Sequence, residues 1–238
     1  MTTLDLTTAR SLGGAPLLGV LLDVDGTLLD SNDAHAEAWV RALRDSGRDT
    51  AFAHARRLIG MGGDKVLPEL TGLEEDSTEG KRIEKRRKEI FQRELLPTLR
   101  PFRETRALVE RMRVDGLTLV VASSSDRETL DGLLERAGVG DLMDAVTSSS
   151  DVDASKPDPD VVHAAIRKSG HPAAALVMIG DTPYDVAAAK QAGVPLIALR
   201  SGGWHDGELA GAAEIYDDPA DLLASYDRSM LGRARAGR

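Results

Sequence analysis

Two aspartates, Asp23 and Asp25, follow directly after the apolar run 17–22 and precede a glycine. A mostly apolar run without polar alternation predicts a strand that is buried on both faces. The period of a strand places the two carboxylates on the same side, and Gly26 ends the strand just beyond them. Neighbouring carboxylates repel each other unless a cation lies nearby or one is protonated. Mg²⁺, together with a phosphate that bonds to one carboxylate, would satisfy this pattern.

Three further apolar runs resemble the first, at 117–122, 175–179 and 194–199. Each is preceded or followed by a helical pattern, which is typical of a parallel α/β sheet. The runs lead into polar residues, among them Ser123 and Asp181. Open α/β sheets bind ligands beyond the carboxyl ends of their strands, so we expect these side chains to converge on the first aspartates.

A weaker strand at 145–147 leads into a loop rich in serine and aspartate that reaches Lys156. Three helix starts are also marked. Ser125–Glu128 has the spacing of a capping box, and Asp158–Pro159 and Thr182–Pro183 each combine an N-cap residue with proline at the first helical position. Helix N-termini that face the strand ends would favour an anion there.

Four motifs therefore occur in order: Asp23-x-Asp25-Gly26-Thr27, a strand ending in Ser123, Lys156-Pro157, and Gly180-Asp181-x-x-x-Asp185. Together they resemble the haloacid dehalogenase superfamily of phosphohydrolases, in particular its phosphatase and β-phosphoglucomutase-like group. The resemblance spans residues 20–186. It implies an α/β fold with a Rossmann-like parallel sheet and an α-helical cap inserted between the first two motifs.

The resemblance also implies roles for the motif residues. Asp23 would be the nucleophile that forms an aspartyl-phosphate, and Asp25 would protonate the leaving oxygen and then deprotonate a water, which calls for a raised pKa. Mg²⁺ would be held by Asp23, the backbone carbonyl of Asp25 and Asp181. Asp185 would bind through a water or serve only as an acid in the first turn of a helix. The phosphate oxygens would be held by Ser123, Lys156 and backbone N–H groups at Ser124 and at Gly26 or Thr27.

Residues 30–101 interrupt the α/β pattern. A helical stripe runs from Ala34 to Leu43, a highly charged helix is predicted at 81–95, and a glycine-rich loop at 59–65 lies between them. We interpret this insert as a helical lid with hinges near Ser31 and Leu99. The expected organisation is a flexible tail at 1–16, a core formed by 17–29 and 102–227, a helical cap at 30–101 and a flexible tail at 228–238.

The cap is expected to select the substrate. Gly62 and Gly63 precede a helix start that suits a polar or anionic group, and Lys65 could add a positive charge. His35 and Trp39 lie four residues apart on one helix, where ordinary packing explains both. Similar residues occur in the sugar-phosphate mutases of the superfamily, so a functional role for His35 remains open.

Composition excludes several other classes of protein. The 238-residue chain has a formal net charge of −9, which argues against a nucleic-acid partner, and no cysteine, which excludes disulfides and thiolate sites. The basic stretch 81–88 is therefore interpreted as a solvated helix face. No apolar run approaches the roughly 20 residues that a spanning helix needs. We expect a cytoplasmic monomer or dimer that binds a small phosphorylated metabolite, without a nucleic-acid or membrane partner.

The leading functional interpretation is a Mg²⁺-dependent phosphatase for a sugar phosphate or a phosphoglycolate-like molecule. A β-phosphoglucomutase-like phosphotransferase remains open, because segment 30–39 is similar, although Asp185 is not typical of the mutases. A non-catalytic phospho-aspartate switch or binding module is a third alternative, which the inserted lid disfavours. A calcium-binding EF-hand loop is disfavoured because Thr27 and Leu28 stand where it needs an acid and a glycine.

Overall fold

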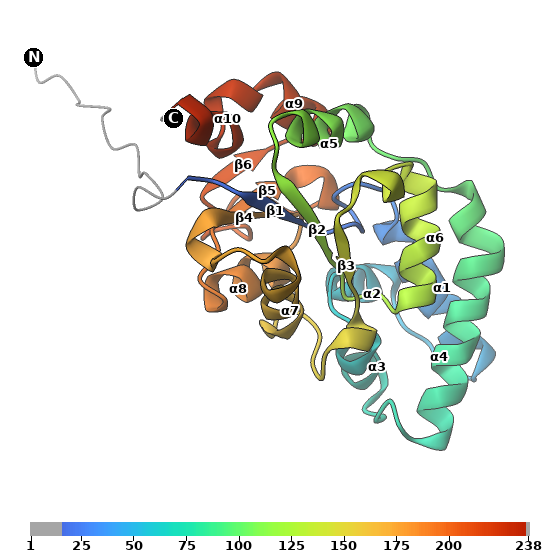
Figure 1. The fold of residues 1–238 in the computed structure, drawn as a ribbon. Helices are drawn as coiled ribbons and strands as arrows, with labels where there is room; N and C mark the ends of the chain where they lie inside the picture. The colour runs from blue at the N-terminus through green and yellow to red at the C-terminus, as the bar shows by residue number, and fades with distance from the viewer. Residues whose placement is uncertain (1–15, 237–238) are drawn as a thin grey trace, which may run out of the picture.

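A parallel six-stranded sheet forms the centre of the computed structural model, which describes residues 16–236 (Figure 1). Five strands lie where the sequence predicts them, and the sixth, of three half-buried residues, carries no apolar run that would reveal it. The predicted tail at 1–16 falls almost wholly outside the described residues. The sheet order is β3-β2-β1-β4-β5-β6, with β1 (Gly19–Leu22), β2 (Thr118–Ala122), β3 (Ala145–Thr147), β4 (Leu176–Gly180), β5 (Leu196–Leu199) and β6 (Glu214–Tyr216).

Helices cover both faces of this sheet, which explains why the strands are apolar throughout. Alternate residues of β1 divide between two clusters: Val20 and Leu22 pack on one side, and Leu21 packs on the other. The first face is covered by α5 (Thr105–Val114), α6 (Arg127–Ala137) and α9 (Pro219–Ala224), and the second by α7 (Asp160–Ser169) and α8 (Pro183–Gln191).

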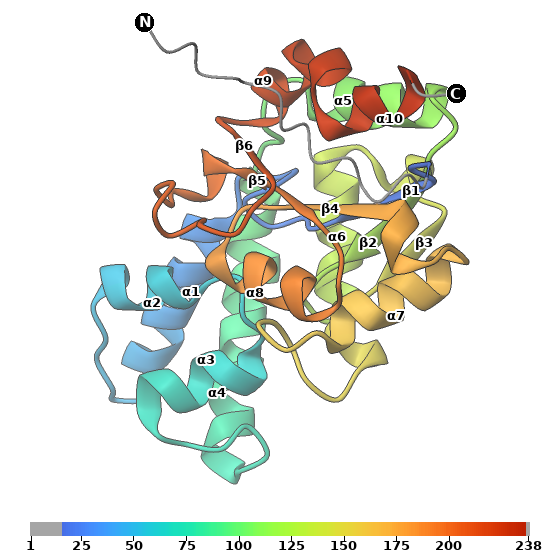
Figure 2. The same ribbon diagram turned by 90° about the vertical axis from the view of Figure 1, so that its left-hand side faces the viewer.

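The insert between β1 and α5 is helical, as the sequence predicts, and Figure 2 shows its helices grouped together beside the sheet. Its longest element continues from α-helix into a π-helical stretch and a short 3₁₀ turn. The helices are α1 (Asn32–Asp45), α2 (Phe52–Leu58), α3 (Gly63–Thr71) and α4 (Thr78–Ile90), followed by Phe91–Leu95 and Leu96–Thr98. We call this group the cap helices.

The helix starts differ from the prediction in two places. Thr182 caps α8 as expected, but α6 is capped by Asp126, whose side chain accepts from the backbone of Thr129, rather than by Ser125. Helix α7 begins at Asp160 and has Pro159 rather than Asp158 as its N-cap residue. The Asp158 carboxylate instead pairs with Lys65 of the cap helices, at 2.7 Å.

The C-terminal segment corrects a second expectation, since 228–236 is not a loose tail. Helix α10 (Met230–Ala236) packs beside the core, with Leu231 buried in the same cluster as Tyr226. Arg233 forms an ion pair with Glu214 of β6. Tertiary contacts therefore stabilise a short helix that carries little sequence pattern of its own. Residues 237–238 lie outside the described part.

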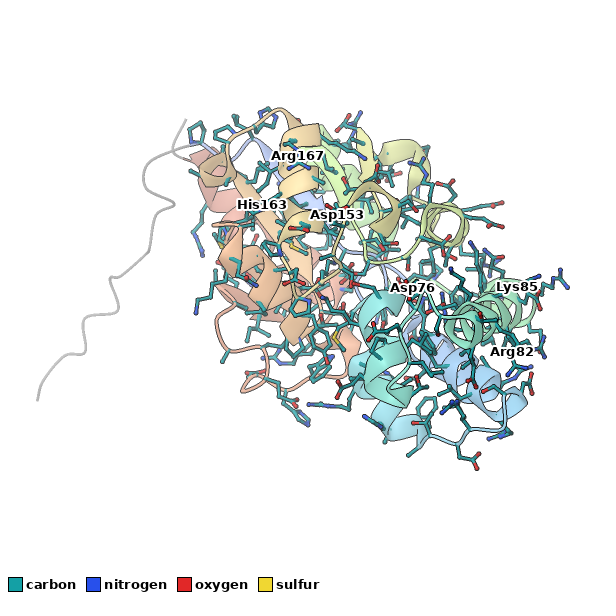
Figure 3. All side chains as sticks on the ribbon, turned by 90° about the horizontal axis from the view of Figure 1, so that it is seen from below. Asp76, Arg82, Lys85, Asp153, His163 and Arg167 are labelled. Carbon is teal, nitrogen blue, oxygen red and sulfur yellow. The ribbon has the colours of Figure 1, made fainter. Side chains whose placement is uncertain are left out.

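The exposed charges are spread over both parts of the molecule. Arg82 and Lys85 lie on α4 of the cap helices, well away from His163 and Arg167 on α7 of the core (Figure 3). Of the helices in the described range, none combines the length and apolar character required to span a membrane.

Candidate active site

Three of the predicted site residues lie at the carboxyl ends of neighbouring strands. Strand β1 pairs in parallel with both β2 and β4, and the register aligns the ends of all three. Asp23, Ser123 and Asp181 each follow one of these strands and are at most 5% exposed. The sheet therefore brings together residues that are up to about 160 positions apart in the chain, as the sequence predicts.

Asp23 forms a buried ion pair with Lys156. The lysine Nζ lies 2.7 Å from Asp23 Oδ1 and 2.7 Å from Asp185 Oδ1. Burial raises the pKa of Asp23 to about 7; Lys156 opposes this rise, and Asp185 and Asp25 add to it. Burial works against the charge on Lys156, but Asp185 and Asp23 raise its pKa above the ordinary value. One ammonium is thus shared by more carboxylates than it can neutralise.

Asp181 is held in place by neutral donors rather than by a cation. Thr27 Oγ1 donates to its Oδ1 at 3.0 Å, and Asn32 Nδ2 donates to its Oδ2 at 2.9 Å. Gly26 has a φ of +73°, and a Cβ there would lie 2.2 Å from Asp181 Oδ2, so only glycine fits. Burial raises the pKa of Asp181 well above its ordinary value, and the charges of Asp185 and Asp23 add to this effect.

These carboxylates fit a divalent cation. Asp23, Asp181 and Asp185 each offer a buried oxygen, and the three oxygens lie within 4.8 Å of one another. Burial is the main cause of the raised pKa of Asp23 and Asp181, and the neighbouring carboxylate charges add to it. Buried carboxylate oxygens of this kind suit Mg²⁺. Asp185 also caps α8 by accepting from Thr182, so its capping role and its place in the acid cluster coexist. We call these three residues the acid cluster.

Asp25 lies apart from the acid cluster in its own set of hydrogen bonds. Its Oδ1 is 2.5 Å from Ser31 Oγ and 2.8 Å from His35 Nε2, and Ser125 Oγ donates to Oδ2 at 3.1 Å. Burial alone would raise the pKa of Asp25, but His35 and these hydrogen bonds together lower it. The expectation that this carboxyl has a raised pKa is therefore wrong: the raised pKa values belong to Asp23 and Asp181.

A cavity of about 280 Å³ joins the two aspartates to the cap helices. Its size is near the lower limit of small-molecule sites. Gly62 and Gly63 of the glycine-rich segment 59–65, which we call the cap loop, line it, as do His35 and Trp39 of α1. The remaining lining residues come mainly from α4 and from the loop after β2. Two hydrogen bonds close the cap loop over the core near Lys156: Gly62 N–H donates to Ser155 Oγ at 2.9 Å, and Ser155 N–H donates to Asp64 Oδ2 at 3.2 Å.

Comparison with known proteins identifies the family. Residues 20–199 match the family described as haloacid dehalogenase-like hydrolase. The chain belongs to this family. It is 31% identical to "Probable phosphatase IndB" of Dickeya dadantii, over 91% of this chain and 93% of the relative. It is 28% identical to the phosphoglycolate phosphatase of Yersinia pseudotuberculosis, over 90% of this chain and 94% of the relative.

Solved structures of the haloacid dehalogenase-like fold superpose well on this chain. A hydrolase from Pseudomonas syringae superposes with a TM-score of 0.82 at 31% identity and covers 89% of this chain and 98% of its own. A β-phosphoglucomutase from Clostridium difficile superposes with a TM-score of 0.80 at 16% identity, covering 93% of this chain and 100% of its own, which shows a shared fold alone. The sheet and helices predicted from the four motifs are thus those of this hydrolase family.

The residues of this hydrolase that are predicted to bind phosphate differ from one another in their surroundings. Ser124 lines the cavity, and its buried Oγ has no hydrogen-bond partner among the described residues. Ser123 does not line the cavity, and its Oγ accepts from the backbone of Ser125 at 3.0 Å. The Thr27 hydroxyl contacts Asp181. Phosphate binding by Ser123, Ser124, Lys156, Gly26 and Thr27 stays a prediction.

Lys65 is placed differently from the expectation. It forms an ion pair with Asp158, 2.7 Å away, and does not line the cavity. Three residues that contact Asp25 or Asp181 were not predicted as site residues: Ser31, Asn32 and Ser125. The first two begin the cap insert as buried polar residues beside the hinge, where the run Asp30-Ser31-Asn32 was the available signal.

Proposed function

We propose that this haloacid dehalogenase-like hydrolase is a Mg²⁺-dependent phosphatase, which hydrolyses a small phosphorylated metabolite through an aspartyl-phosphate at Asp23. One observation carries the proposal: a buried carboxylate that is paired with Lys156 at 2.7 Å opens onto a cavity that also reaches a second carboxylate, Asp25. A nucleophile, a cation and an acid–base group are the parts that phosphoryl transfer needs.

Asp23 acts as the nucleophile in this scheme. One of its carboxylate oxygens attacks phosphorus, and the bond between phosphorus and the ester oxygen breaks as the acyl phosphate forms. Lys156 neutralises charge next to the reacting carboxylate. Water then attacks the acyl phosphate, inorganic phosphate leaves, and the Asp23 carboxylate is restored.

Asp23, Asp181 and the carbonyl of Asp25 would hold Mg²⁺, and Asp185 lies close enough to contribute. When bound, the ion offsets negative charge on the phosphate and on the acid cluster. Thr27 and Asn32 orient the Asp181 carboxylate through their hydrogen bonds. These hydrogen bonds keep the Asp181 carboxylate in a fixed orientation within the acid cluster.

Asp25 and His35 together hold the proton for the leaving group. Their 2.8 Å contact is short enough for the pair to share one proton between Nε2 and Oδ1. Asp25 donates that proton to the departing ester oxygen and later accepts one from the attacking water. His35 is stacked on Phe91, with ring centroids 3.9 Å apart, so the ring cannot turn away from the carboxylate.

A β-phosphoglucomutase-like phosphotransfer is the second candidate. The observation in its favour is His35, which reaches from the cap helices to the acid–base carboxylate and lines the cavity. Incubation with β-glucose 1-phosphate separates the two reactions. A mutase accumulates glucose 6-phosphate, whereas the phosphatase that we favour releases free phosphate.

The decisive experiment measures phosphate release from p-nitrophenyl phosphate with Mg²⁺ and with EDTA. We expect activity with Mg²⁺ only, and a loss of more than about a thousandfold in Asp23→Asn. Asp30→Asn, an exposed aspartate in the same segment, is the matched control and should retain full activity. Metal-independent turnover, or an active Asp23→Asn protein, would refute the proposal, and a single stoichiometric phosphorylation without turnover would indicate a switch module.

A further inference from the structure

One wall of the cavity is formed by α4. Four residues of this helix line the cavity together with Glu75: Glu84, Lys85, Arg87 and Lys88. The basic stretch 81–88 of this helix is predicted from the sequence to be a solvated helix face. The structure instead turns part of it inward, and the Glu84 and Arg87 side chains are only 15% and 14% exposed.

Glu84 and Arg87 form an ion pair in which some hydrogen-bonding groups of both side chains stay unused. Arg87 Nε donates to Glu84 Oε2 at 2.8 Å, and the guanidinium lies 5.2 Å from the ring centre of Trp39. Glu84 Oε1 is buried and has no hydrogen-bond partner in the described part of the chain. A buried carboxylate oxygen without a donor is costly, so a ligand that brings a hydroxyl donor is stabilised there.

Gly63 leaves room for the Glu84 carboxylate. A Cβ at position 63 would lie 2.2 Å from Glu84 Oε1, so any other residue would displace the carboxylate. The cap loop and α4 therefore meet through this glycine. The predicted importance of Gly63 for specificity thus acquires a physical basis that the sequence did not reveal.

The charges along this wall disfavour a second anionic group on the substrate. Lys88 is already paired with Asp126 at 2.8 Å and with Glu128 at 2.9 Å. Lys85 also lines the cavity, but it is exposed, and solvent weakens its attraction for a carboxylate (Figure 3). Burial raises the pKa of Glu75, and the charge of Glu84 adds to that rise, which reflects the negative potential here.

We propose that Glu84 and Arg87 are the specificity-determining pair of the cavity, and that the substrate is the phosphate monoester of a polyhydroxylated alcohol without a distal carboxylate. One substrate hydroxyl donates to Glu84 Oε1, and a neighbouring hydroxyl accepts from an Arg87 N–H group that Glu84 does not use. This inference rests on the proposed phosphatase activity and narrows its substrate class. It separates the protein from phosphatases whose substrates end in a carboxylate.

A matched pair of substrates tests the proposal. Glycerol 3-phosphate and 3-phosphoglycerate differ in that a hydroxymethyl group replaces a carboxylate. We expect the wild type to prefer glycerol 3-phosphate by at least about tenfold in kcat/KM, equivalent to about 1.4 kcal/mol. A wild-type preference for 3-phosphoglycerate, or no preference, overturns the inference without any variant.

Substitutions then locate the effect. Glu84→Gln should reduce the preference by about tenfold, and Gly63→Ala should change it in the same direction by displacing the carboxylate. Glu89→Gln, which alters a carboxylate on the same helix outside the cavity lining, should leave the ratio within about twofold. An unchanged ratio in both Glu84→Gln and Gly63→Ala overturns the assignment. Failure of all substrates, including p-nitrophenyl phosphate, would instead overturn the phosphatase proposal.

Discussion

Removal of divalent cations should make the stability of this protein fall as the pH rises. Asp23 and Asp181 both have raised pKa values in the folded state. Between about pH 4 and pH 7 the folded protein keeps protons that the unfolded chain has released. Because the unfolded state binds fewer protons, the free energy of unfolding decreases across this window and stays low above it.

The size of the effect follows from Asp23. Its pKa rises from 3.8 to about 7 on folding. A difference of roughly 3 units at about 1.36 kcal/mol each gives a loss of about 4 kcal/mol between the two limits. Asp181 shifts in the same direction and adds to the loss. Lys156 stays protonated throughout this range, so its own raised pKa does not change the slope.

Urea denaturation followed by circular dichroism, at pH 5 and pH 8 with EDTA, measures the effect. The metal-free protein should be less stable at pH 8, and Mg²⁺ should restore stability there by binding the ionised carboxylates. Asp23→Asn provides the control, since it lacks the titrating group and should be more stable than the wild type at pH 8 without metal. Equal or greater stability of the metal-free wild type at pH 8 would refute this account of the acid cluster.

Two further outcomes are expected. Gly26→Ala should destabilise the fold by at least about 2 kcal/mol, because φ is +73° and the new Cβ would meet Asp181; Gly47→Ala, with a φ of +77° and open space around it, should cost only about 1 kcal/mol. Similar urea midpoints for the two variants would contradict the close-contact argument. His35→Ala should lower kcat by about tenfold or more and move the acidic limb of its pH profile upward, because the pKa of Asp25 rises when the ring is lost; an unshifted profile would show that His35 only packs.

Much of the sheet could be predicted because buried parallel strands have continuous apolar sequences. The strands at 117–122 and 194–199 appear where their patterns place them, to within two residues. Strand β6 and helix α10 could not be predicted, because they are short and are stabilised by contacts with distant parts of the chain. Glu214, for example, is bound by Arg233.

The active site divides in the same way. The sequence by itself determined which residues stand at the strand ends, because that depends only on where apolar runs stop, and Asp23, Ser123 and Asp181 could be predicted on that ground. Lys156, in the loop beyond β3, could be predicted only from its motif. Only the tertiary structure decided which carboxylate carries the raised pKa, since His35 reaches Asp25 from a cap helix whereas Asp23 shares one lysine with Asp185. Burial and charge at a given atom are sums over neighbours that lie far apart in the chain, and no local pattern of residues encodes that sum.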